Sequence, residues 1–281
     1  MSEKKVNLLG YSLHSLEVFF SEIGEPKFRA KQLIKWIHQK GVLDFEQMSD
    51  FNKQLRSKLK SLAVLLPPKI EEVHKSPEGT IKYLIKLESG SMVEMVRIPE
   101  KKRMTLCISS QAGCALQCTF CATGAQGFEK NLTSDEIIGQ LWLANFDNKE
   151  QPLITNVVFM GMGEPLLNFV PVIESAKIMK EQFAYGLSRK RITISTSGIT
   201  PQINKLSSEI DVSLAISLHA PINELRDEIV PINKKYPIKE LMNSCNKYLD
   251  FYDGKRSITI EYVLIDGVKS IRVSIDDSNE Y

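Results

Sequence analysis

Hydrophobic and polar positions change their spacing twice along the chain, and each change predicts a different kind of structure. Residues 12–66 contain three stretches with the amphipathic spacing of helices: SLHSLEVFFSEIG, KFRAKQLIKWIHQKG and FNKQLRSKLKSLAVLL. Residues 69–110 alternate instead in the manner of strands. From Thr133 onward, helical and strand-like stretches follow each other in turn, and Thr133 with Glu136 predicts a capping box.

The last of these patterns favours an α/β fold. Strands that alternate with helices of this length are typical of βαβ units, which build a parallel sheet. The expected parallel strands are MTLCIS, ITNVVFM, RITIST, VSLAISL and SITIEYVLI. We therefore expect a small helical domain over residues 1–68, a β extension over 69–103 and a main domain over 104–281.

Composition describes an ordinary soluble protein. The 281 residues are 43% hydrophobic and 25% charged, and the formal net charge of +2 is too small to indicate a nucleic-acid binder by itself. No apolar run is long enough to span a membrane, and the N-terminus lacks the apolar core of a signal peptide. We expect a cytoplasmic protein, whose five cysteines stay reduced.

Basic residues gather on the second and third predicted helices. They include Lys27, Arg29, Lys31 and Lys35 on the second helix and four more on the third: Lys53, Arg56, Lys58 and Lys60. Such faces could follow a phosphate backbone, although a run of charges usually marks only a solvated helix surface.

Four of the five cysteines lie between Cys107 and Gly127, and Cys114, Cys118 and Cys121 have the spacing C-x3-C-x2-C. A closed zinc site needs four ligands, and no fourth Cys or His stands at the usual spacing. Three thiolates suit a four-iron, four-sulfur cluster with one open iron. The alternatives are a zinc site completed by a distant residue, or reduced structural thiols. The fifth, Cys245, fits a buried structural thiol.

Further candidates follow the predicted parallel strands, at the ends where functional residues of such folds gather. GMGEP follows the second strand, and its glycines could let the backbone approach a ligand while Glu164 accepts from an ammonium group. It could equally be an ordinary glycine turn. STSG follows the third strand, and the fourth ends in Ser217, Leu218 and His219, although a lone histidine is more often structural.

At the cysteine motif, with Phe120 before the third cysteine, the sequence resembles the radical S-adenosylmethionine (SAM) superfamily. Its further motifs resemble the RlmN/Cfr family of RNA adenine methyltransferases, and the RlmN branch most: Cys107, SSQAGC, CATGAQGF, NLTSDEIIGQ, GMGEPLLN, STSG and ISLHAP. The resemblance implies a partial (β/α)6 barrel, which lacks its last strand here, and an N-terminal helical domain that binds RNA.

The resemblance also implies an activity, which is methylation at C2 of an adenosine in 23S ribosomal RNA and of the adenosine 3′ of the tRNA anticodon. Cys114, Cys118 and Cys121 would hold the four-iron, four-sulfur cluster. The implied SAM contacts are Gly163, Glu164, Ser195, Ser217, Leu218 and His219. An electron donor such as flavodoxin and a monomeric enzyme are implied as well.

Two other roles come from the same resemblance. Glu94 would be the proton acceptor, although by composition it is only an outward-facing strand carboxylate. Cys107 would resolve a protein–RNA adduct by forming a transient disulfide with a cysteine that SAM has methylated. The alternatives are a Cfr-like enzyme acting at C8, a non-catalytic iron–sulfur RNA-binding protein, and a zinc-stapled RNA-binding module.

The sequence departs from the family after Gly267. There the family continues to the segment with the methylated cysteine, whereas this sequence reads VKSIRVSIDDSNEY. We therefore expect the 281-residue chain to bind a cluster and SAM without completing methyl transfer. Mass spectrometry of nucleosides from RNA incubated with the chain, SAM and a reductant tests this expectation, and C2-methyladenosine would contradict it.

Overall fold

The computed structural model describes residues 5–148 and 150–264. Its N-terminal part has three helices, as the sequence predicts: α1 (Leu13–Glu22), α2 (Phe28–His38) and α3 (Lys53–Leu62). The third helix is shorter than its pattern suggests, because the residues that follow it form strand β2 (Ala63–Val64). This strand pairs in parallel with β1 (Val6–Asn7). Side chains of Ser12 and Asn52 cap α1 and α3 by accepting backbone N–H groups.

One eight-stranded sheet forms the centre of the molecule, in the order β12-β11-β10-β9-β6-β5-β4-β3. The five predicted parallel strands are its first five members: β6 (Arg103–Cys107), β9 (Asn156–Phe159), β10 (Ile192–Thr196), β11 (Ser213–Ser217) and β12 (Thr259–Glu261). Antiparallel strands extend it: β3 (Lys69–Lys75), β4 (Ile81–Lys86) and β5 (Met92–Glu100). The predicted α/β fold is thereby confirmed.

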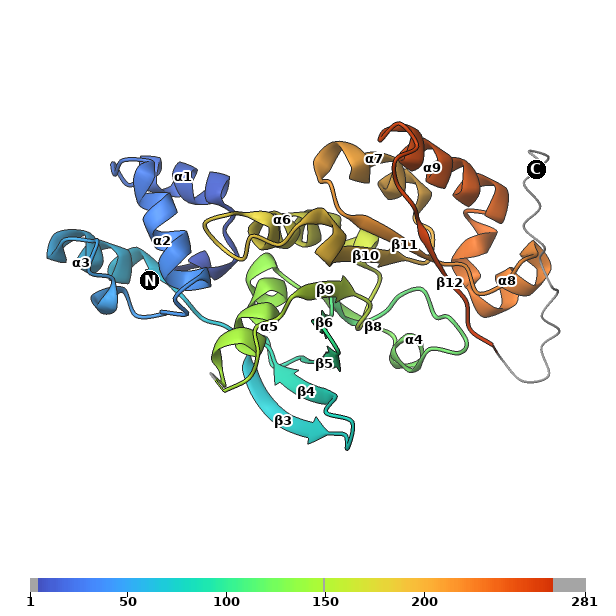
Figure 1. Cartoon of the computed structure of the whole chain (residues 1–281), viewed down its shortest axis with the longest axis horizontal. Coiled ribbons are helices and arrows are strands. Elements are labelled where there is room, and N and C mark those ends of the chain that lie inside the picture. Colours follow the sequence, from blue (N-terminus) through green and yellow to red (C-terminus); the bar gives the residue numbers. More distant parts are fainter. Residues whose placement is uncertain (1–4, 149, 265–281) are drawn as a thin grey trace.

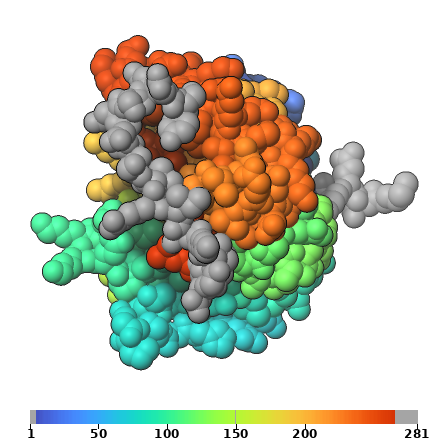
Figure 2. Space-filling model, turned by 90° about the vertical axis from the view of Figure 1, so that its right-hand side faces the viewer, coloured from blue at the N-terminus to red at the C-terminus, as the bar shows by residue number. Residues whose placement is uncertain are grey.

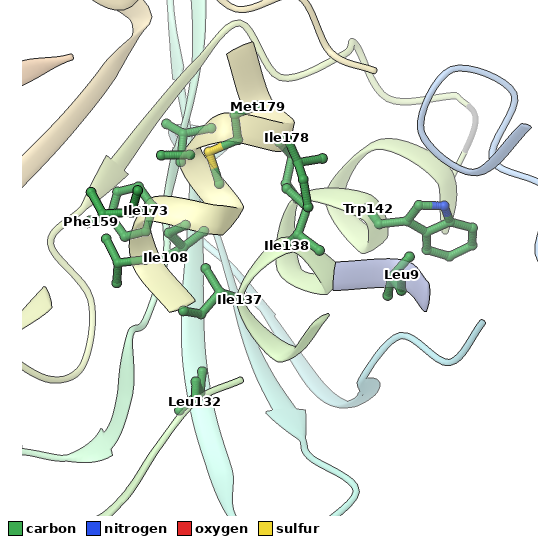
Figure 3. Close-up of a cluster of buried hydrophobic side chains, with 14 of the residues drawn as sticks. Leu9, Ile108, Leu132, Ile137, Ile138, Trp142, Phe159, Ile173, Ile178 and Met179 are labelled. Carbon is green, nitrogen blue, oxygen red and sulfur yellow. The ribbon is translucent and has the colours of Figure 1, made fainter. Parts of the chain in front are cut away.

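Four long helices connect the parallel strands: α5 (Ser134–Phe146), α6 (Phe169–Lys180), α7 (Thr200–Glu209) and α9 (Ile238–Asp250). The capping box of α5 is present, since Glu136 accepts the Thr133 backbone N–H at 2.9 Å. Side chains of α5 and α6 form a core with Phe159 of β9 and with Ile108, which directly follows β6 (Figure 3). This apolar layer supports one face of the sheet and leaves the other for polar residues.

The N-terminal helices pack directly on this core, although Figure 1 shows them at the far end of the molecule from α9. Leu9 is fully buried beside α5, and the indole Nε1 of Trp142 donates to the carbonyl oxygen of Ile37 at 3.0 Å. His38 contacts the hydroxyl of Tyr185 through Nδ1 at 3.0 Å, and burial lowers the His38 pKa to about 3. Buried hydrogen bonds of this kind join the two parts firmly.

Several short elements are not predicted by the sequence patterns. They are a hairpin of β7 (Gln111–Gly113) and β8 (Phe128–Asn131), the helices α4 (Ala122–Gln126) and α8 (Asn223–Ile229), and 3₁₀ turns at Leu8–Gly10, Phe45–Gln47, Pro165–Asn168, Arg189–Arg191 and Pro231–Lys234. Within the described residues, no helix has the length and apolar character needed to cross a membrane.

Candidate functional site

Strand register places most of the predicted site residues on one face of the sheet. Cys107 pairs with Val96 and Val158, Val158 with Thr193, and Ser217 with Glu261. Paired residues share a face, and so do residues two apart on a strand. Glu94, Cys107, Ser195, Ser217 and Glu261 therefore lie on the same face, which we call the inner face. The other face carries fully buried residues such as Leu106, Val157 and Ile194.

Three of the inner-face residues form a hydrogen-bonded group at the ends of β10, β11 and β12. The hydroxyls of Ser195 and Ser217 donate to the same carboxylate oxygen of Glu261, at 3.0 and 2.7 Å. The two hydroxyl oxygens are 3.3 Å apart. Glu261 was missed by sequence reasoning, and its only signal is a charged residue inside the apolar stretch SITIEYVLI. It orients both serines.

Cys107 ends β6 beside this group. Its thiol pKa is raised to about 11, first by burial and further by the negative charge of Glu261, while a backbone hydrogen bond to Met160 opposes the shift. Cys107 is therefore a neutral thiol at physiological pH. All five cysteines of the chain lie within the described residues and all are free.

The three-cysteine loop lies between the strands of the β7–β8 hairpin. Gly113, with φ +71°, leads into it, and the Cys114 N–H donates to the carbonyl oxygen of Gly127 at 2.8 Å. A Cβ atom on Gly113 would lie 1.8 Å from that oxygen, so only glycine closes the hairpin. The Thr119 N–H donates to the carbonyl oxygen of Ile229, the last residue of α8, at 3.1 Å. Backbone hydrogen bonds to Gly127 and Ile229 thus fix the loop at Cys114 and at Thr119.

The three thiols are electrostatically coupled. Burial raises the pKa of Cys114 and raises that of Cys118 to about 11, and the pKa of each is raised further by negative charge on Glu164 and on the other cysteines of the loop. Bringing three thiolates together therefore requires a compensating positive charge. Among the described residues, no three His, Cys, Asp or Glu side chains are grouped so that they could hold a single metal ion. A multi-iron cluster contacts each cysteine through a different iron and fits this donor set.

Phe120 of the loop contacts His219, which follows β11, and so connects the cysteines to this strand. Their rings meet edge to face, with centroids 4.7 Å apart. His219 adopts φ +61°, and its Nδ1 accepts the N–H of Val263 at 3.2 Å. Burial lowers its pKa, Glu261 raises it and Arg226 lowers it. Leu218 accepts a hydrogen bond from Arg226 through its carbonyl oxygen at 2.9 Å.

GMGEP packs against the connection from β6 to β7. A Cβ atom on Gly163 would lie 2.4 Å from that of Gln111, so this glycine allows close approach of the protein's own chain. Glu164 is 2% exposed, and its carboxylate accepts the N–H groups of Ser197 at 2.7 Å and Leu166 at 3.0 Å. Burial raises the Glu164 pKa while these hydrogen bonds lower it. Cofactor contacts of Gly163 and Glu164 stay predictions.

Glu94 lies on the inner face of β5, across the sheet from Glu261. Its carboxylate forms an ion pair with the ammonium group of Lys82 at 2.6 Å, and both side chains are partly exposed. The sequence pattern describes this residue correctly as a carboxylate on an accessible strand face. Its proposed proton transfer is untested by these contacts.

Two family models match different parts of the chain. Residues 6–65 match the family model described as the ribosomal RNA large subunit methyltransferase N-terminal domain. Residues 108–270 match the model of the radical SAM superfamily.

Relatives of known function are similar along nearly the whole chain. The dual-specificity RNA methyltransferase RlmN of Pseudomonas putida is 53% identical over 272 residues, which are 95% of this chain and 71% of that protein. RlmN of Marinobacter nauticus is 51% identical, covering 94% of this chain and 73% of its own length. A radical SAM methyltransferase crystal structure from Sphaerobacter thermophilus superimposes with a TM-score of 0.86 at 38% identity, over 94% of this chain and 77% of that one.

The hairpin around the cysteine loop yields a matched pair of stability predictions. Gly113 and Gly127 both have positive φ, so alanine at either position costs about 1 kcal/mol or more in backbone strain. Only at Gly113 does the new Cβ meet another atom within 4 Å. We expect Gly127→Ala to lower the melting temperature by about 3 °C and Gly113→Ala by at least twice as much. Equal shifts by differential scanning calorimetry would contradict the hairpin geometry.

Proposed function

The chain belongs to the RlmN family of radical SAM RNA methyltransferases, and we propose that its site is built to recognise C2 of an adenosine in 23S ribosomal RNA and of the adenosine 3′ of the tRNA anticodon. The observation that carries the proposal is the gathering of the cysteine loop, Cys107 and the strand-end serines at one end of a radical SAM fold. The printed names of the relatives, which describe dual-specificity RNA methyltransferases, support the two substrates.

Cys114, Cys118 and Cys121 are proposed to hold the four-iron, four-sulfur cluster, which when bound supplies the electron that cleaves SAM. Positive iron would offset the burial and the neighbouring negative charge that raise the pKa values of Cys114 and Cys118. The loop is already anchored by backbone hydrogen bonds at Cys114 and Thr119. Little chain ordering would therefore accompany cluster binding.

Strand-end residues are proposed to bind SAM: Gly163, Glu164, Ser195, Ser217, Leu218 and His219. The two serine hydroxyls are oriented by Glu261, which supports their use as hydrogen-bonding groups for a polar cofactor. Glu164 accepts two backbone N–H groups, and a carboxylate has capacity for further donors such as an ammonium group.

Glu94 and Cys107 are proposed to act on the RNA. Glu94 would accept a proton, and its position on the accessible inner face supports contact with a large substrate. Cys107 would resolve the protein–RNA adduct through a transient disulfide. Its raised pKa keeps the sulfur protonated until a base removes the proton, which limits unwanted oxidation before that step.

Residues 1–68 are proposed to be an RNA-binding accessory domain, followed by the β extension over 69–103 and the radical SAM core from 104. The match to a ribosomal RNA methyltransferase N-terminal domain supports its role. Lys31 and Lys35 are exposed on α2 and approach the ring of Phe183 in the core, to 5.4 and 4.8 Å. We also propose a cytoplasmic monomer that receives electrons from a donor such as flavodoxin.

Iron and sulfide analysis tests the cluster. We expect the anaerobically reconstituted chain to contain about four irons and four sulfides and to absorb visible light. Cys118→Ala should lose most of both, because one of only three thiolate ligands is gone. Cys245→Ala is the matched control, since Cys245 is a buried thiol on α9, outside the loop, and should keep the full content. Stoichiometric zinc without visible absorption would overturn the proposal.

Salt-dependent RNA binding tests the accessory domain. The double variant Lys31→Gln/Lys35→Gln should bind RNA more weakly and reduce the slope of log K against log salt by about 1.5, because two phosphate contacts are lost. Lys60→Gln is the control, since Lys60 already pairs with Glu46 at 3.0 Å and should change the slope less. Identical slopes for the double variant and the unchanged chain would exclude this face of α2 from the RNA interface.

A further inference from the structure

Beneath the site, α8 carries a buried arginine surrounded by neutral acceptors. Arg226 is 0% exposed. Its guanidinium donates to the carbonyl oxygens of Leu218, Ser197 and Ser217, at 2.9, 2.7 and 3.2 Å. The remaining terminal nitrogen, Nη1, donates to the Asn233 side-chain oxygen at 2.8 Å. These four bonds use four of its five N–H donors but leave its positive charge to be balanced.

No carboxylate forms an ion pair with Arg226 in the part of the chain that the structure describes. The neighbouring Asp227 accepts instead from the Asn233 amide at 2.6 Å, and its charge acts on Arg226 only at longer range. A buried cation is costly unless negative charge lies nearby. Burial lowers the Arg226 pKa to about 10, and negative charge on Cys118 is the first influence that raises it.

The contacts of α8 explain why Cys118 lies close to Arg226. The Cys118 side chain packs against a small apolar group of Ala220, Ile229 and Val230, which flanks α8. The next residue of the loop, Thr119, donates its N–H to Ile229 at 3.1 Å. In Figure 2 the orange surface of this region adjoins the green surface of the cysteine loop. The guanidinium and the sulfur therefore belong to two segments in direct contact.

Ser197 connects the two groups. Its carbonyl oxygen accepts from Arg226 at 2.7 Å, while its hydroxyl lies beside Cys118 and lowers the pKa of that thiol. Its N–H donates to Glu164 at 2.7 Å, so both of its backbone polar groups are engaged. Arg226 thus holds the loop that presents a hydroxyl to one of the three cysteine sulfurs.

We propose that Arg226 and Ser197 are positioning residues that raise the reduction potential of the cluster that Cys118 helps to hold, an inference that rests on the proposed function. Reduction adds one electron from a one-electron donor and makes the cluster one unit more negative, with no bond made or broken. A buried positive charge and a hydroxyl donor to a ligand sulfur both stabilise the more negative form. The cluster in turn supplies the negative charge that Arg226 lacks.

The test is a dithionite titration of the reconstituted chain, followed by electron paramagnetic resonance without RNA. Arg226→Gln should lower the equilibrium constant for cluster reduction about tenfold or more, which for one electron is a shift of about 59 mV to lower potential. Arg226→Lys should retain most of the potential because it keeps the charge. Ser197→Ala should shift it in the same direction as Arg226→Gln, and it leaves the backbone contacts to Arg226 and Glu164 in place.

Lys234→Gln is the control, because it removes the same charge from an exposed position shortly after α8 and should leave the potential unchanged. Unchanged potentials in Ser197→Ala and Arg226→Gln, with full iron content, would overturn the inference and leave the proposed function standing. If Arg226→Gln fails to fold, an unchanged potential in Ser197→Ala is sufficient to overturn it. Absence of a four-iron cluster in the unchanged chain would instead overturn the proposed function.

Discussion

Side-chain register across the parallel strands is the constraint on which the site depends. From Cys107 on β6 to Glu261 on β12, the pairings keep Ser195 and Ser217 on the inner face and place buried apolar residues under the helices. A slip of one residue in any strand would exchange the two sets. Because the apolar set is buried, the free energy of the core also fixes the direction of the polar side chains.

The cysteine loop has little regular structure of its own and takes its position from surrounding segments. Its first cysteine is held by Gly127, Thr119 by the residue that ends α8, and Phe120 by the ring of His219. Ser197 adds a contact from the end of β10 to Cys118. Four elements that are separate in sequence therefore meet at the loop, so its geometry depends on the completed fold rather than on local conformational preference.

The sequence predicts the parallel strands, their order along the chain and the long helices, because these depend on local periodicity. It also indicates the cysteine loop and the serines at strand ends, since motif spacing and strand ends are both visible in one dimension. Arg226 could not be found in this way, and Ser197 is visible only as part of the STSG motif, without its contact to Arg226. Arg226 looks like a surface charge on a polar helix, and its acceptors belong to β10, β11 and their loops. Glu261 is hidden likewise, because the two serines that donate to it are distant in sequence.

Contacts with residues distant in sequence also explain the roles of Gly163 and Glu164 in GMGEP. The pattern indicates a ligand-binding turn, but much of its conformational freedom serves internal packing, with Gly163 against Gln111 and Glu164 against Ser197. Those internal contacts are relevant to function because Ser197 joins Glu164 on one side to Arg226 and Cys118 on the other. A substitution in GMGEP would therefore be transmitted to the cysteine loop through Ser197, even if no cofactor touched the substituted residue. Loss of activity in such a variant would not by itself identify a cofactor ligand, whereas a change in cluster potential without a change in SAM affinity would identify this internal connection.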